Sequence, residues 1–257
     1  MPVDFDRTAH DYARYRSDFP PELFTRLAAH GIGRPGHRVV DVGTGTGTLV
    51  RGFATAGCAV TGVDIAPDML RQARHQDTAL GLDIAYRVAP AEDTGLPGQA
   101  WDVVSAGQCW HWFDRPRVAA EAHRLLVGGG TLVICYRDYS TAPGSLGAAS
   151  DELVRAHHPD WPLVGGSYGD AAWSAELESA GFDHHDTIGF DIDVPFTHEA
   201  WRGRMRSSNG IGASLTEAEV AAFDADLARL LRERFPAEPL VVPHRIWAVI
   251  ARRPTPA

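Results

Sequence analysis

Cysteine is scarce in this chain of 257 residues, and the three that occur, Cys58, Cys109 and Cys135, show no CxxC spacing. An odd number without paired spacing predicts free thiols in a reducing compartment, and it argues against a disulfide framework or a zinc knuckle. The twelve histidines also lack the spacing of metal ligands. We therefore expect no metal site.

Long apolar runs and excess positive charge are missing as well. No stretch approaches the roughly 18 apolar residues that a membrane span needs, and the N-terminal stretch MPVDFDRTAHDYARYR is too polar for a signal peptide. The formal net charge of −9 argues against unspecific binding to nucleic acid or to an anionic membrane. A cytoplasmic location is expected by default, and the oligomeric state stays open.

Strand and helix patterns alternate through the first half of the chain. Strands are expected over 38–42, 58–64, 84–89, 101–108 and 131–138, and a glycine triplet at 128–130 is expected to stop the helix over 115–126. This alternation predicts parallel βαβ units in an open, doubly wound α/β sheet of the Rossmann-like type.

The regular alternation of strands and helices ends after residue 140. A linker is expected over 140–150, followed by helices at 170–182, 198–208 and 216–234 and by strands at 187–196 and 239–253. An antiparallel last strand pair would complete a seven-stranded sheet, with an inserted helical cap. The expected division is an N-terminal helical lid at 1–36, a core at 37–140, and the rest of the sheet with the cap at 141–257.

The stretch VVDVGTGTGTLV at 39–50 places glycines at every second position after a strand. No Lys-Ser/Thr pair follows, which excludes a triphosphate P-loop. A dinucleotide fingerprint would need its third glycine at Thr48, whereas the chain has Gly43, Gly45 and Gly47.

Two carboxylates narrow the class of ligand that this turn could bind. Asp41 precedes the first glycine by two residues, where it would repel a pyrophosphate. Asp64 ends the next strand, where an acid accepts hydrogen bonds from ribose hydroxyls. A ribose with a positive charge and no required phosphate describes S-adenosylmethionine.

Five segments extend this pattern: VVDVGTGTG, VTGVDIAPDML, AEDTGLP, WDVVSAGQCWHWFD and RLLVGGGTLVI. With them the chain resembles class I S-adenosylmethionine-dependent methyltransferases of the methyltransferase type 11 kind over about residues 5–140. YRSDFPPEL and CWHWFD further resemble the small-molecule branch that includes trans-aconitate methyltransferase.

The resemblance implies a cofactor site made of Tyr12, Arg16, Asp41, Gly43, Thr44, Gly45, Gly47, Asp64, Ile65, Met69, Ala91, Glu92 and Gln108. The glycine-turn residues and Gln108 would lie beside the methionyl part, with Asp41 on its ammonium and Arg16 of the lid on its carboxylate. Asp64 would take the ribose diol, and Ile65 and Met69 would line the adenine.

One position departs from the family. An aspartate often precedes the Ala-Glu pair, and this chain has Pro90 there. Recognition of the adenine amino group would then fall to the backbone near Ala91 and to Glu92.

Acceptor contacts are expected from two places. Trp110 and Trp112 follow the fourth strand and could contact the sulfonium or the substrate, and His111 between them is the candidate catalytic base. Arg204 and Arg206 could hold an acceptor carboxylate. The alternatives are an aromatic core segment and a solvated basic face.

The sequence therefore predicts a methyltransferase that acts on a small-molecule acceptor, at a carboxylate or hydroxyl oxygen. An NAD-dependent oxidoreductase and a non-catalytic S-adenosylmethionine-binding module remain as alternatives. A carboxylate needs no base at pH 7, whereas a hydroxyl loses its proton during transfer. The sequence does not distinguish a carboxylate acceptor from a hydroxyl acceptor.

Overall fold

The computed structural model describes residues 8–161 and 170–255, so predictions for 1–7, 162–169 and 256–257 lie outside the described residues. The helices are α1 (Ala9–Tyr15), α2 (Pro21–Ala29), α3 (Val50–Thr55), α4 (Pro67–Leu80), the short 3-10 helix η2 (Trp110–Trp112), α5 (Arg115–Leu125), α6 (Leu146–His157), α7 (Asp170–Ser179), α8 (His198–Arg206) and α9 (Glu217–Arg234). The strands are β1 (Arg38–Val42), β2 (Ala59–Asp64), β3 (Ala85–Val88), β4 (Trp101–Gly107), β5 (Leu126–Tyr139), β6 (Asp183–Phe196) and β7 (Leu240–Arg252).

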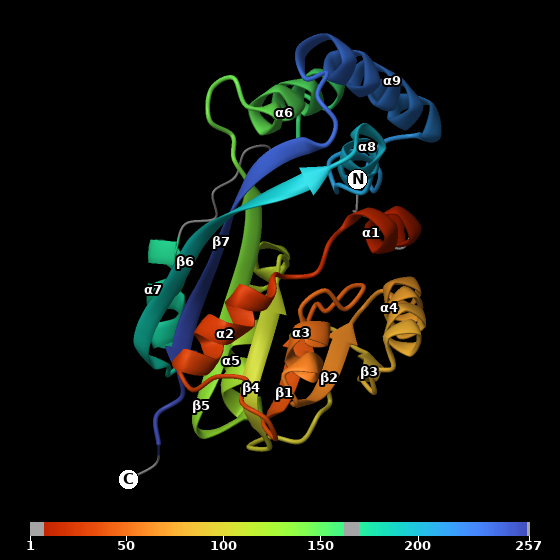
Figure 1. Cartoon of the computed structure of the whole chain (residues 1–257). Helices are drawn as coiled ribbons and strands as arrows, with labels where there is room; N and C mark the ends of the chain where they lie inside the picture. Colours follow the sequence, from red (N-terminus) through yellow and green to blue (C-terminus); the bar gives the residue numbers. More distant parts are fainter. Residues whose placement is uncertain (1–7, 162–169, 256–257) are drawn as a thin grey trace. The chain divides into compact units, whose positions relative to one another are not determined.

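The strands form one seven-stranded sheet in the order β3-β2-β1-β4-β5-β7-β6. The five strands from β3 to β5 in this order are parallel. β7 runs in the opposite direction to its neighbours, as Figure 1 shows and as reciprocal bonds between Arg253 and the Gly129–Gly130 pair require. The predicted fold class is confirmed. The order reverses at β1, so the carboxyl ends of β1 and β4 lie together, where open α/β sheets bind ligands.

The described residues divide into two compact units. The first contains 8–17, 138–161 and 191–245, and the second contains 18–137, 170–190 and 246–255. No helix among the described residues is long and apolar enough to span a membrane. The same residues hold no group of three or more His, Cys, Asp or Glu side chains arranged for a metal ion.

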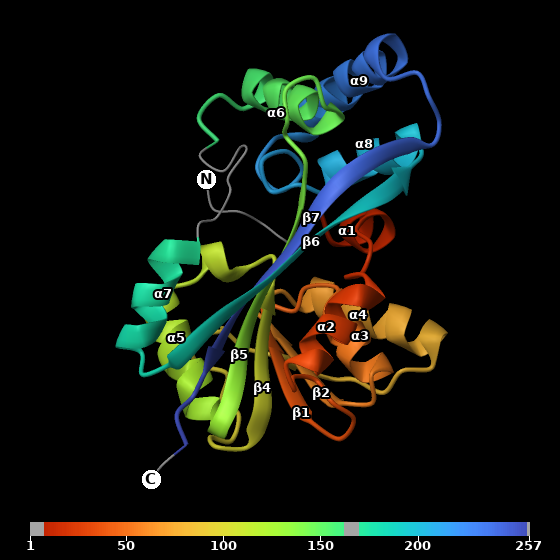
Figure 2. The same ribbon diagram turned by 60° about the vertical axis from the view of Figure 1, so that its left-hand side comes forward.

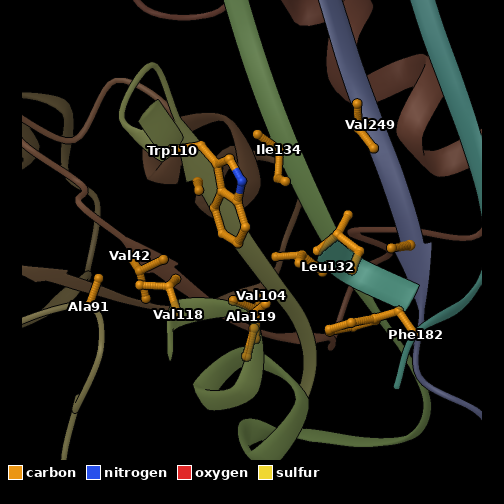
Figure 3. Close-up of a cluster of buried hydrophobic side chains, with 14 of the residues drawn as sticks. Val42, Ala91, Val104, Trp110, Val118, Ala119, Leu132, Ile134, Phe182 and Val249 are labelled. Carbon is orange, nitrogen blue, oxygen red and sulfur yellow. The ribbon is translucent and has the colours of Figure 1, made fainter. Parts of the chain in front are cut away.

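The second unit contains the parallel strands and a core on the α5 side of the sheet. Val104, Leu132 and Ile134 of the strands pack there against Val118 of α5 and Phe182 after α7 (Figure 3). The other face carries α2 and α3 (Figure 2), whose rings Phe24 and Phe53 meet edge to face at 5.2 Å between centroids. Burial on both faces explains why β1 and β4 are almost continuously apolar.

The first unit has a separate core built from helices α6, α8 and α9. Trp201, Phe223 and Leu227 are fully buried in it. Gly203 of α8 lets α1 approach closely, because a Cβ there would lie 2.2 Å from the Tyr15 ring. The predicted capping box at Thr216 and Glu219 is present at the start of α9.

Two local predictions are wrong. The glycine triplet does not end α5, since the helix stops at Leu125 and β5 begins at Leu126 in an extended conformation. The expected linker at 140–150 contains the start of α6, because Ser145 accepts a hydrogen bond from the Ala148 N–H at 3.1 Å and caps a helix. The small residues of this stretch concealed that helix in the sequence.

Candidate functional site

The glycine turn joins β1 to α3 with three left-handed residues. Gly43, Gly45 and Gly47 have φ of 65°, 55° and 83°. A Cβ on Gly43 would lie 2.8 Å from the Cys109 sulfur, and one on Gly47 would lie 2.8 Å from an Arg51 nitrogen, whereas nothing lies within 4 Å of a Cβ on Gly45. The turn is therefore held by packing at its two ends and open at its middle, where a ligand can approach the backbone.

Asp41 lies beside this turn near the end of β1, with 1% of its surface exposed. The Ser105 hydroxyl donates a hydrogen bond to its carboxylate at 2.6 Å, and among the described residues no basic side chain forms a salt bridge with it. Burial raises the pKa of Asp41 to about 7, although hydrogen bonds from Ser105 and Thr44 offset part of this effect. A cation placed against Asp41 would recover much of that cost.

Asp64 closes the turn from the neighbouring strand β2. Its two carboxylate oxygens accept hydrogen bonds from the Gly45 N–H at 2.7 Å and the Ala66 N–H at 2.9 Å. A carboxylate oxygen can accept more than one hydrogen bond, so a carboxylate at this place suits ligand hydroxyls. Ile65, next in the chain, is 66% exposed, whereas Met69 is 4% exposed and belongs to the core. An exposed isoleucine beside a carboxylate suits the ring of a nucleoside.

The remaining predicted cofactor residues of this unit follow β3 and β4. Ala91 is buried, and Glu92 accepts a hydrogen bond from the Asp114 N–H at 3.1 Å. Gln108 has a φ of 62°, which is uncommon outside glycine, and its amide donates to the Arg137 carbonyl at 2.5 Å. Strained backbone of this kind gathers at ligand sites.

The aromatic segment after β4 divides into a buried and an accessible part. Trp110 is 0% exposed and points into the core among residues such as Ile134 (Figure 3). The expectation that Trp110 contacts the sulfonium or the substrate is therefore wrong, because its whole indole is packed in the hydrophobic core. Trp112 is half-buried, and its ring lies 5.0 Å from that of His111.

His111 is linked to a buried tyrosine of β5. Its Nδ1 lies 2.8 Å from the Tyr136 hydroxyl, and its backbone N–H donates to the same oxygen at 3.3 Å. Burial lowers the pKa of His111 to about 4. The imidazole is therefore neutral at pH 7, as a base must be, but it binds a proton weakly.

The other predicted residues belong to the first unit. Tyr12 and Arg16 contact each other, with the guanidinium 5.0 Å from the ring centroid, and Arg16 donates to the Ser207 hydroxyl at 3.2 Å. Their role as a cofactor lid stays a prediction.

Arg204 and Arg206 have different surroundings. Arg206 forms salt bridges with Asp11, Glu199 and Asp224, which holds its charge within the unit. Arg204 is 4% exposed and lies 4.6 Å from the centroid of the Tyr139 ring. The arrangement does not resemble the predicted solvated basic face, and contact of either arginine with an acceptor stays a prediction.

Comparison with known proteins agrees with this geometry. Residues 40–134 match the family model described as a methyltransferase domain. An uncharacterized methyltransferase of Mycobacterium tuberculosis is 34% identical over 132 residues, which cover 51% of each protein. The chain thus spans about half the length of this curated relative.

Two further proteins extend the comparison beyond residues 40–134. A ubiquinone biosynthesis O-methyltransferase of Xanthomonas euvesicatoria is 28% identical over 197 residues, with 73% of this chain and 75% of the relative covered. The solved phosphoethanolamine N-methyltransferase 2 of Haemonchus contortus, in complex with S-adenosylhomocysteine, has a TM-score of 0.59 and 19% identity, with 97% of this chain and 58% of that chain covered. The latter likeness shows the fold alone.

The sequence alone did not single out three residues of the second unit. Ser105, which lies opposite Asp41 in the β1–β4 register, could have been found as a polar residue inside an apolar strand. Tyr136 gave no signal, because its link to His111 depends on tertiary packing. Arg51 donates a hydrogen bond to the Thr46 carbonyl at 2.7 Å and forms salt bridges with Asp18 and Asp77, so it holds the backbone of the glycine turn in place.

Proposed function

We propose that this chain transfers a methyl group from S-adenosylmethionine to an oxygen of a small-molecule acceptor. The observation that carries the proposal is the pair of carboxylates around the glycine turn. Asp41 is buried without a basic partner among the described residues, and Asp64 is tied to the Gly45 N–H.

The residues fit this cofactor better than they fit a dinucleotide. The ammonium of the methionyl part would neutralise Asp41, the ribose hydroxyls would bind Asp64, and the adenine would cover Ile65. A pyrophosphate at the turn would instead face the carboxylate of Asp41, and the glycine spacing departs from the dinucleotide fingerprint. This argues against an NAD-dependent oxidoreductase.

The cofactor supplies an electrophilic methyl group on a sulfonium. The contribution of the chain is to align the acceptor with that methyl group and to exclude water. His111 and Trp112 follow β4 and are the candidates for contact with the acceptor, with Arg204 as a candidate for its negative charge. The O-methyltransferase name of the Xanthomonas relative supports oxygen as the methylated atom.

The finer predictions belong to the same proposal. Residues 1–36 would act as a lid, 37–140 as the cofactor core and 141–257 as the acceptor cap, as in the trans-aconitate methyltransferase branch. Turnover of small carboxylic acids tests that branch directly.

Calorimetric titration with S-adenosylmethionine, S-adenosylhomocysteine and NAD tests the proposal. We expect both sulfur compounds to bind and NAD not to bind. Asp64→Asn should weaken binding of both sulfur compounds, whereas Asp83→Asn, an exposed acid before β3, should leave it unchanged. Preference for NAD, or no binding of either sulfur compound, would refute the proposal. Binding without turnover of any acceptor would favour the non-catalytic module.

A further inference from the structure

The contact between His111 and Tyr136 bears on which nitrogen of the imidazole carries the proton, as well as on the position of the ring. Tyr136 is 0% exposed, and its ring stacks on Trp247 with centroids 4.8 Å apart and planes 13° apart. A second indole, Trp173, lies 5.5 Å away. The phenol is therefore fixed by stacking, and its oxygen meets His111 at both the backbone nitrogen and Nδ1.

The proton in this contact has a preferred place. A backbone N–H can only donate, so the His111 N–H occupies a lone pair of the Tyr136 oxygen. A phenol donates more strongly than it accepts, which directs its single proton to Nδ1 at 2.8 Å. A neutral imidazole with Nδ1 as acceptor carries its own proton on Nε2.

We propose that Tyr136 is a positioning residue that fixes His111 as the Nε2–H tautomer, so that His111 donates a hydrogen bond to the methyl acceptor and does not remove a proton from it. The inference rests on the proposed function and specifies what its acceptor must be. An acceptor that needs no base is already an anion, and a carboxylate is the common case at pH 7.

The transfer then balances without a base. A carboxylate oxygen uses a lone pair to form the new O–CH3 bond, the S–CH3 bond breaks, and the sulfur keeps its electron pair. The products are a methyl ester and neutral S-adenosylhomocysteine. His111 holds the second carboxylate oxygen through Nε2–H, and no proton moves.

The chemistry of the alternative is unfavourable. A phenol with a pKa of about 10 would have to lose its proton to a base. Burial lowers the pKa of His111 to about 4, so such a transfer would run uphill by roughly six pKa units. An acceptor hydroxyl therefore fits this histidine poorly.

Nitrogen-detected NMR of the intact, 15N-labelled protein at pH 7 tests the tautomer without any acceptor. We expect the His111 proton on Nε2 in the wild-type protein and a loss of this preference in Tyr136→Phe, which keeps the stacked ring. Observation of the proton on Nδ1 in the wild-type protein would overturn the inference. Titration with S-adenosylhomocysteine is run in parallel. Its failure to bind would refute the proposed function while the tautomer result stands.

Substitutions then separate a donor from a base. His111→Gln keeps an N–H donor but cannot accept a proton, so its kcat should remain within about tenfold of wild type, whereas His111→Ala should lose about 100-fold. His123→Gln in α5 is the matched histidine control and should be unchanged. The assay transfers a radiolabelled methyl group to small carboxylic acids or to phenols of similar size, because alkali releases the label from esters but not from phenyl ethers. Alkali-stable product with equal losses in both His111 variants would overturn the donor role.

Discussion

Cofactor affinity should depend on pH through Asp41, because this carboxyl must be ionised to bind an ammonium. Burial raises the pKa of Asp41 to about 7 in the ligand-free protein. At pH 6, one unit below that value, about ten molecules in eleven carry the proton, and affinity should be about tenfold lower than at pH 8. At higher pH the α-amino group of the ligand loses its own proton. Affinity should therefore fall again in the alkaline range.

The assay is calorimetric titration with S-adenosylhomocysteine from pH 5.5 to 9. At pH 6, buffers of different ionisation enthalpy should reveal the release of nearly one proton on binding. Asp41→Asn should bind weakly and lose the acidic part of the profile. A wild-type affinity that stays flat from pH 5.5 to 7.5, or an acidic decline that persists in Asp41→Asn, would refute the reasoning.

Stability provides an independent check of the same pKa. Because the pKa is raised from 3.8 to about 7, the folded protein holds a proton between these values that the unfolded chain has released. The free energy of unfolding should then fall by about 1.4 kcal/mol per pH unit across this window, up to about 4 kcal/mol in total. Asp41→Asn should raise the unfolding midpoint relative to wild type at pH 8 but not at pH 4. A lower midpoint at pH 8 would mean that the ionised carboxylate is well compensated in the folded state.

Four substitutions test the turn and its support. Gly45→Ala should destabilise the fold by about 1 kcal/mol because of its positive φ alone. Gly43→Ala should destabilise it by more, because of these two positions only a Cβ on Gly43 would meet neighbouring side chains. Thermal unfolding compares the two variants, and equal losses of stability would contradict the packing argument. Arg51→Met should cost about 3–5 kcal/mol, since it leaves Asp77 buried without its cation, and urea unfolding that matches wild type would disprove this. Asp64→Asn should weaken S-adenosylhomocysteine binding by about 10- to 100-fold through the loss of charged hydrogen bonds, and unchanged affinity would place the ribose elsewhere.

The parallel half of the fold was predictable because its signals are local. Each strand from β1 to β5 is an apolar run followed by a turn, and the register of such runs leaves few topologies. The positions of Asp41 and Asp64 at the ligand rim follow directly from that topology. The helix α6 was missed because its cap at Ser145 lies among turn-forming residues that also suit a linker.

Side-chain environments could not be predicted to the same depth. Trp110 and Trp112 are two residues apart and chemically identical, yet one is buried and the other partly accessible. The difference comes from how η2 packs on β5, which no pattern in the sequence encodes. In the same way, Tyr136 is distant from His111 in the chain, so their contact became visible only through the sheet register.

The division of the long strands between the two units limits how this protein could be recombined. β5, β6 and β7 each contribute residues to both units, at 137/138, 190/191 and 245/246. A chimera that exchanges one unit for its counterpart from a relative would join foreign sequence inside three hydrogen-bonded strands, where a slip of one residue reverses every side chain. Shuffling at the helix ends, or substitution of single residues, is the more practical way to change acceptor preference. The same constraint implies that divergence in this chain proceeds by point changes more readily than by exchange of blocks.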